Sequence, residues 1–359
     1  MKFGAQLNQD RKKIVEVGAA FLKRYSVEMC LAENLTRIEC EGKIINSHTV
    51  PKSSSLKKIE RNGHVYSFDK KDLLALDESK GKFFPQLNGI NKASTFKGFC
   101  GKHDRALFAP IEVSDFIGSP EQCFLLFYRA YAKEVYNKKI NYNDRETNYK
   151  ILESNEKIPF QKKILLKSYL DDHFTGMSFA IDDISRLKPL MDEILEKQDY
   201  DKVKALIIEF DEPLPFMTSG AVYPEQGFDG KVIQDLLARD FNPFYSLGCT
   251  SFSSNDKGYF VFTWLNIENN PIDKFIDSFL NIKDHYKFNH LLKMTFHFFE
   301  NIFMSPEWWE SLGKEHNEYL INTMNRNINP FLKRLKHPLK YDGYRLPNIR
   351  FKEIRKVNF

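Results

Sequence analysis

The amino-acid sequence predicts an α+β fold in three successive parts. Cys and His residues between positions 30 and 103 indicate a metal-stapled module in residues 1–112, which also include an N-terminal helix. Apolar residues then recur at helical spacing and predict a helical region in residues 113–200. Strand-like runs separated by turn residues predict a small antiparallel sheet in the third part, residues 201–359, with C-terminal helices and a basic tail.

The first part is expected to alternate between short helices and short strands. Its predicted helices are residues 11–25, residues 54–62 and a closing helix that begins within residues 104–108. Its predicted strands lie within residues 27–45, interrupted by the turn signal Glu41-Gly42, and within residues 63–68. The charged stretch 69–89 has no clear period and is interpreted as an insertion.

The middle part begins with the strongest helix signal in the chain, residues 119–138. Pro120 and Glu121 suit the first turn of a helix. The backbone N–H that proline lacks has no partner within the helix there, and an acid lies at the positive end of the helix dipole. Aromatic residues fill one face, which predicts a core helix behind the metal module, and Arg129 and Lys133 lie on the opposite side. Residues 141–159 are predicted to be a linker, and residues 164–172 and 181–197 two separate helices.

The third part changes period and becomes strand-like. The predicted strands are residues 203–210, 216–223, 243–252 and 259–265, and residues 253–258 form a hairpin turn between the last two. The predicted helices are residues 272–280 and 287–303. Trp308 and Trp309 are adjacent, so one is expected in the core and the other turned away from it.

Four residues carry the metal prediction: Cys30, Cys40, Cys100 and His103. Thiolate and imidazole are the ligands of zinc, and a closed set of four is typical of a structural site. The Cys100-x2-His103 spacing lets one tight turn present two ligands to the same ion. Cys123 and Cys249 have no second ligand type nearby and are expected to be buried thiols.

The segment from Cys30 to Asp104 resembles the zinc-bound treble-clef nucleases of the HNH (ββα-metal) superfamily. Ser47-His48-Thr49-Val50-Pro51 lies where that family has Asp-His-x-x-Pro, and Cys100 and His103 lie where it has the closing Cys-x2-Cys. The resemblance implies a treble-clef fold and a catalytic centre made of His48, Asn91 (or Asn88) and Asp104. It also implies two kinds of metal: a structural Zn²⁺ and a catalytic Mg²⁺ or Mn²⁺.

The chain departs from that pattern at three points. Ser47 replaces the acid that helps to hold the catalytic cation, nine residues rather than two lie between Cys30 and Cys40, and the stretch from His48 to Cys100 is long. Three hypotheses therefore remain open: an endonuclease, a binding module that has lost catalysis, and a protein-interaction scaffold, for example in bacterial antiviral defence or a mobile element.

Composition limits the class of protein. The chain has 359 residues, 42% of them hydrophobic and 14% aromatic, which excludes bulk disorder. Five Cys are too few for a disulfide framework at this length and favour metal binding in a reducing cytosol, so a cytoplasmic location is expected. No apolar run suits a signal peptide or a membrane span.

The tail interleaves basic and aromatic residues. A net charge of +5 permits a nucleic-acid partner, and cations pair with phosphates while rings stack on bases. The residues predicted to bind DNA or RNA are Lys333, Arg334, Lys336, Arg345, Arg350, Arg355 and Lys356. The alternative is a solvated chain end, and the Phe-rich helices leave a protein partner or a second copy of the chain as further expectations.

Overall fold

A computed structural model describes residues 27–68, 83–154, 156, 159–236, 245–328 and 335–359. It confirms the α+β class. The described strands form one sheet of eight strands and one of two. The predicted helix at residues 11–25 and the residues Lys333 and Arg334 lie outside the described residues. Within the described part, no helix is both long and apolar enough to cross a bilayer.

The large sheet is antiparallel throughout and has the strand order β10-β5-β8-β7-β6-β9-β2-β3. Its strands are β2 (His64–Ser67), β3 (Gln86–Gly89), β5 (Val203–Phe210), β6 (Phe216–Val222), β7 (Leu247–Ser254), β8 (Lys257–Leu265), β9 (Ile302–Met304) and β10 (Glu353–Val357). Asn255 and Asp256 have positive φ at the β7–β8 turn, as a two-residue hairpin requires. The sheet is larger than the small sheet predicted, because strands from the first third and from the tail join it.

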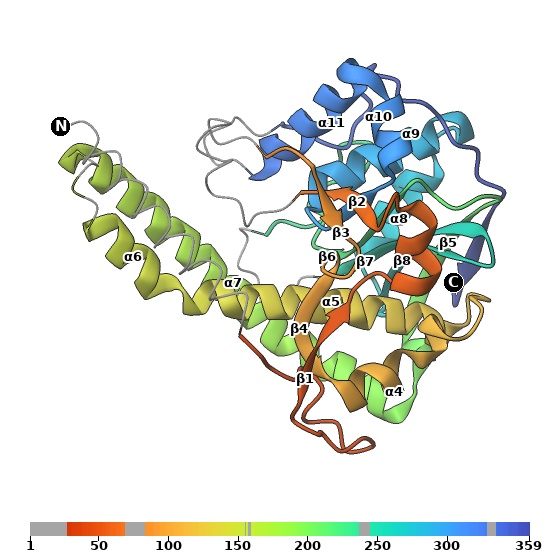
Figure 1. The fold of residues 1–359 in the computed structure, drawn as a ribbon, viewed down its shortest axis with the longest axis horizontal. Helices are drawn as coiled ribbons and strands as arrows, with labels where there is room; N and C mark the ends of the chain where they lie inside the picture. The colour runs from red at the N-terminus through yellow and green to blue at the C-terminus, as the bar shows by residue number, and fades with distance from the viewer. Residues whose placement is uncertain (1–26, 69–82, 155, 157–158, 237–244, 329–334) are drawn as a thin grey trace.

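Alternate residues of each central strand enter two different cores. In β5, Ala205 and Ile207 face one cluster, whereas Leu206 and Ile208 face the other. The first cluster is covered by α5 (Pro120–Asn143), and the second by α8 (Ile272–Leu280), α9 (Asp284–Phe298), α10 (Pro306–Ser311) and α11 (Gly313–Ile328). Helices therefore cover both faces of the sheet (Figure 1).

The small sheet lies beyond α5, on the side away from the large sheet (Figure 1). It pairs β1 (Ile44–His48) with β4 (Thr95–Cys100), and α4 (Gly101–Glu112) follows β4 directly. The turn of π-helix Lys52–Leu56 and the short α2 (Lys57–Ile59) follow β1. Phe99 of β4 stacks edge-on against Phe108 of α4 at 5.2 Å, and Phe96 does the same against Tyr136 of α5 at 5.5 Å. The prediction that the helix at 119–138 lies behind the metal module is confirmed.

Three helix predictions were wrong. The two helices predicted at 164–172 and 181–197 are one helix, α7 (Phe160–Lys197), because the single Gly176 between them costs a helix interior only about 1 kcal/mol and does not interrupt it. The predicted linker 141–159 contains α6 (Arg145–Ser154), which packs along α7 in an arm that leaves the body of the molecule (Figure 1). The helix predicted to reach residue 303 ends at Phe298, since Ile302–Met304 pairs as β9.

Candidate metal centre and adjoining polar cluster

The four predicted metal ligands lie together. The Sγ atoms of Cys30, Cys40 and Cys100 and a ring nitrogen of His103 all lie within 4.8 Å of one another. The Nδ1 atom of His103 is 3.3 Å from Cys30 Sγ and 3.2 Å from Cys100 Sγ. A tetrahedral ion with metal–ligand bonds of about 2.0–2.3 Å needs its ligand atoms at such spacings. The described residues therefore form a Cys3His cluster that can hold a metal ion.

The start of α4 positions two of these ligands. Cys100 is the N-cap of the helix, and its Sγ accepts a hydrogen bond from the backbone N–H of His103 at 3.4 Å. The Nε2 atom of His103 lies 2.9 Å from the backbone oxygen of Ile38. A proton on Nε2 makes this hydrogen bond and leaves the Nδ1 lone pair directed at the sulfurs, as a metal ligand requires.

Burial and hydrogen bonding act on the ligand side chains in different directions. Burial raises the pKa of the Cys30 thiol to about 12. Burial also raises the pKa of Cys100, but hydrogen bonds from the backbone of His103 and Glu41 outweigh it, and the net pKa is below the usual value. Burial lowers the pKa of His103, which favours the neutral imidazole that a metal requires.

A second polar cluster adjoins the metal centre, where β1, α4 and α5 meet. Its members are Ser47, His48, Asp104, Glu112 and Arg129. Ser47, Asp104 and Arg129 are 1%, 8% and 1% exposed. Five of the ten buried side-chain atoms that have no hydrogen-bond partner among the described residues lie in this cluster: Ser47 Oγ, His48 Nε2, Asp104 Oδ1 and Arg129 Nε and Nη1. Each buried atom without a partner lowers the free energy of unfolding by about 1–3 kcal/mol, so the cluster is suited to binding a polar ligand.

His48 ends β1 and is half-buried. Burial lowers its pKa, the positive charges of Lys52 and Arg129 lower it further, and a hydrogen bond with the backbone of Ile90 opposes both. Because Nε2 has no partner, the contact with Ile90 belongs to Nδ1. The imidazole is thus held neutral, with its Nε2 lone pair unused, which is the state of a general base.

Asp104 and Arg129 are electrostatic neighbours. Burial raises the pKa of the Asp104 carboxyl, and Arg129 and the Ser47 hydroxyl oppose that rise. Ser47 lies close enough to have this effect but makes no hydrogen bond of normal geometry. Arg129 is held by Glu112 at 2.6 Å and by the ring of Phe108, whose centroid is 4.0 Å from its Cζ. These two contacts leave two guanidinium donors unused.

The third predicted catalytic residue is not brought to this cluster. Asn91 is exposed in the turn at residues 90–94, and no contact found among the described residues joins it to His48 or Asp104. The alternative, Asn88, lies in β3 and donates a hydrogen bond to Ser67 Oγ at 2.9 Å. It is the backbone of Ile90, next to Asn91, that contacts the imidazole.

The described part of the tail divides into two sections. Residues 353–357 form β10, and Arg355 contacts Glu209 at 3.7 Å and donates to the carbonyl of Ile117 at 3.1 Å. Lys356 lies in the same strand, over the ring of Phe359 at 4.6 Å. Lys336, Arg345 and Arg350 precede the strand and are exposed. The tail is therefore anchored to the sheet at its end and presents its other basic residues to solvent.

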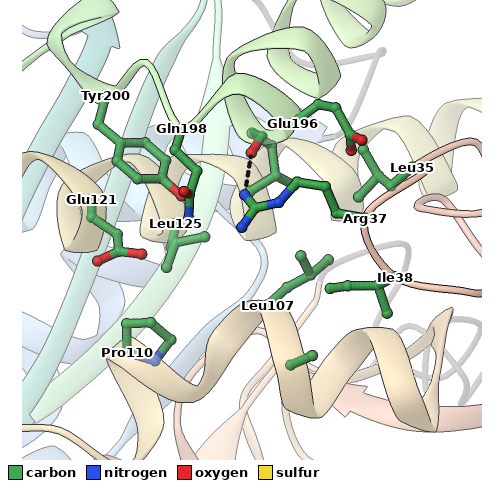
Figure 2. A pocket seen from close by; sticks show the side chains of 12 residues that line it. Leu35, Arg37, Ile38, Leu107, Pro110, Glu121, Leu125, Glu196, Gln198 and Tyr200 are labelled. Carbon is green, nitrogen blue, oxygen red and sulfur yellow. Dashed lines mark hydrogen bonds between the residues drawn. The ribbon is translucent and has the colours of Figure 1, made fainter.

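A cavity of about 130 Å³ adjoins the metal centre (Figure 2). Its lining joins the loop before Cys40 to α4, α5 and the end of α7, and Ile38 contributes its side chain here while its carbonyl contacts His103. Figure 2 shows the Arg37 guanidinium directed into the cavity, where Nη1 donates to the Leu195 carbonyl at 3.4 Å. None of the lining residues belongs to the polar cluster or to the ligand set, so the cavity lies apart from the chemistry proposed below.

Sequence reasoning missed Arg129, Glu112 and Ile90. Arg129 was expected on the side of its helix opposite the core, but α5 is enclosed by the large sheet on one side and the metal module on the other. No sequence signal marked Ile90, because it acts through its backbone. Comparison of the chain with protein-family models, with curated proteins and with solved structures returns no match.

Proposed function

We propose that the chain is an endonuclease that hydrolyses nucleic-acid phosphodiesters, with a structural zinc in the Cys3His cluster. The observation that carries this proposal is the set of buried polar atoms without partners at Ser47, His48, Asp104 and Arg129. They adjoin the Cys3His cluster at the start of α4, and Ser47, His48 and Asp104 follow the order along the chain that the HNH resemblance implies.

Zinc is the metal that best fits the cluster. Three thiolates and one imidazole in a closed set are typical of structural zinc, and the buried Cys30, Cys100 and His103 leave no open position for substrate. Its role here is to fix the start of α4 against the loop that carries Cys30 and Cys40, and thereby to place Asp104, which follows His103 directly.

His48 is the general base in this proposal. Its unused Nε2 accepts a proton from the attacking water, while the Ile90 backbone holds the ring through Nδ1. Arg129 presents Nε and Nη1 to a phosphate oxygen, since a guanidinium is the preferred partner of phosphate. Glu112 and Phe108 keep that guanidinium in place.

Asp104 Oδ1 and the Ser47 hydroxyl are the oxygen donors that fit a small, hard divalent cation. When bound, such a cation polarises the scissile phosphate and stabilises the leaving oxygen. One carboxylate and one hydroxyl are a small donor set, and Arg129 beside them reduces the negative charge. Weak cation binding is therefore expected, with Mn²⁺ supporting cleavage better than Mg²⁺.

A binding module without catalysis is the second candidate, and two observations favour it. Ser47 supplies a neutral hydroxyl where the HNH pattern has an acid, and Asp104 is only 8% exposed. The test is incubation of the zinc-loaded protein with labelled single-stranded and duplex DNA and RNA, in Mn²⁺ or Mg²⁺. Cleavage in Mn²⁺ supports the endonuclease, and intact substrates under every condition favour the binding module.

A further inference from the structure

One surface on the helices that cover the second core combines an exposed and a half-buried aromatic ring with exposed cations. It is formed by the start of α9 and the tail segment 339–346, and its central residues are Tyr286, Tyr341 and Arg345. The Tyr286 and Tyr341 ring centroids are 5.0 Å apart at an interplanar angle of 39°. Arg345 Nη2 donates to the Tyr286 hydroxyl at 3.3 Å, and its Cζ lies 5.8 Å from the centroid of that ring.

The tail segment is fixed in position by α9. The Lys293 ammonium, on a residue only 6% exposed, donates to the Lys340 carbonyl and to Asp342, both at 2.8 Å. Asn289 bonds the backbone of Leu346 in both directions, at 2.7 and 3.3 Å. A buried lysine and a buried asparagine thus hold both ends of a segment whose middle carries the exposed Tyr341 and Arg345.

The helix α11 also holds the tail segment in position. Tyr319 of α11 donates to Asp342 at 2.8 Å and stacks on Tyr344 at 4.0 Å with an interplanar angle of 10°. His316 contacts the Tyr344 hydroxyl at 2.8 Å. Tyr344 is therefore used for packing, whereas Tyr341 is 39% exposed. Because the segment is ordered before any partner arrives, binding at Tyr341 loses little conformational entropy.

The charge of this surface is positive. Asp342 is paired with Lys293 and Asp284 with Lys287, each at 2.8 Å, and the remaining carboxylate is the exposed Glu315 of α11, which lies beside Tyr344. Among the described residues, the exposed cations Lys283, Lys340 and Arg345 make no ion pair with a carboxylate. An exposed aromatic ring can stack on an unstacked base, and the cations around it can pair with phosphates. The two together are typical of a nucleic-acid-binding surface.

We propose that this surface binds single-stranded nucleic acid, with a base stacked on Tyr341 and a phosphate on Arg345. Single strands are chosen over duplexes because a base must leave its own stack to lie on a protein ring. This inference shares with the proposed function only the assumption that the partner is a nucleic acid. It assigns recognition to a surface formed by α9 and the tail, and none of its residues belongs to the polar cluster around His48.

Fluorescence anisotropy of labelled 12-nucleotide strands of DNA and RNA tests the proposal, with the full chain and no added divalent cation, so that cleavage plays no part. Tyr341→Leu should raise Kd roughly 5- to 150-fold without changing the salt dependence, since stacking carries no charge. Tyr341→Phe keeps the ring and should bind like the wild type. Arg345→Gln should reduce the slope of log K against log salt by about 0.7, the value for one phosphate on a single strand.

Lys150→Gln is the control, because Lys150 is an exposed cation of α6 that pairs with Glu146, in the arm away from α9 and the tail (Figure 1). It should leave both Kd and the salt slope unchanged. Equal affinities of the wild type and Tyr341→Leu for the single strand, or tighter binding of the corresponding duplex than of the single strand, would overturn the proposal. Binding without cleavage in Mn²⁺ would contradict the endonuclease alone and leave this surface supported.

Discussion

Arg129 is unusual because it is buried and yet has hydrogen-bond donors without partners. It is also the positive charge of the polar cluster. It is 1% exposed, and one of its nitrogens pairs with Glu112 while two have no partner among the described residues. Leaving donors unpaired away from water opposes folding. A residue that weakens the fold in this way is best explained by a ligand that the site binds.

Replacing Arg129 by methionine separates stability from function. Arg129→Met keeps an apolar chain against Phe108 and frees Glu112, whose side chain is 31% exposed and reaches water. The free energy of unfolding should change little, because the removal of a buried charge with unpaired donors offsets the loss of that charge beside the buried Asp104. Cleavage should fall at the same time. Urea unfolding and a cleavage assay measure the two effects, and a destabilised variant with full activity would show that Arg129 is structural.

His48 makes a prediction about pH. Burial lowers the pKa of its imidazole, so the neutral form persists to a lower pH than the ordinary value of about 6.5. A histidine acts as a general base only when it is neutral. The cleavage rate should therefore be independent of pH above about 6.5 and should fall as the pH drops through the lowered pKa of His48. Single-turnover rates between pH 5 and 8 test this. A rate that increases toward low pH would exclude His48 as the base.

At the scale of the element, α4 connects the two clusters. Its N-cap Cys100 and first-turn His103 belong to the Cys3His cluster, and Asp104, the next residue, is an electrostatic neighbour of Arg129. The sequence was sufficient to predict this part, because ligand types and their spacing are local properties. Arg129 could not be predicted, since α5 is covered on both sides: Arg129 packs on Phe108 and Glu112 of α4, while the opposite side of the helix packs on the large sheet.

Loss of one ligand should therefore unfold the start of α4. Cys100→Ser removes a thiolate and should abolish zinc binding, measured as metal per chain by mass spectrometry. Stability should fall by about 4 kcal/mol if free zinc exceeds its Kd about 1,000-fold. Cys123→Ala and Cys249→Ala are the controls, because both thiols are buried away from the cluster and should retain one zinc per chain. Unchanged stability in metal-free protein would exclude a structural role for the metal.

At the scale of the molecule, α5 is the central layer between the large sheet and the metal module. The spacing of its apolar residues predicted a helix with one apolar face, but residues 122–132 are all buried, on every side of the helix. The sequence of one helix does not reveal that both of its sides are covered. The sheet was underestimated for a related reason. β2, β3 and β10 pair with strands far away in sequence, and short runs give no signal for such partners.

The packing of α5 against the large sheet is so close that a single glycine-to-alanine substitution tests it. A Cβ at Gly248 of β7 would lie 2.5 Å from the Phe127 ring of α5, so Gly248→Ala should lower the free energy of unfolding by about 1–3 kcal/mol. Gly176→Ala is the matched control. Its Cβ would meet nothing within 4 Å in the middle of α7, and alanine should stabilise that helix by about 0.5–1 kcal/mol. Equal effects in urea unfolding would contradict this packing.

The central claim is that His48 performs hydrolysis beside a metal that serves only structure. The most direct measurement compares the wild type with His48→Ala in Mn²⁺, under single-turnover conditions and at equal zinc content and equal Tm. The account predicts that the wild type cleaves slowly and that the variant loses cleavage while retaining about one zinc per chain. Equal cleavage by both proteins, or loss of zinc from the variant, would contradict it.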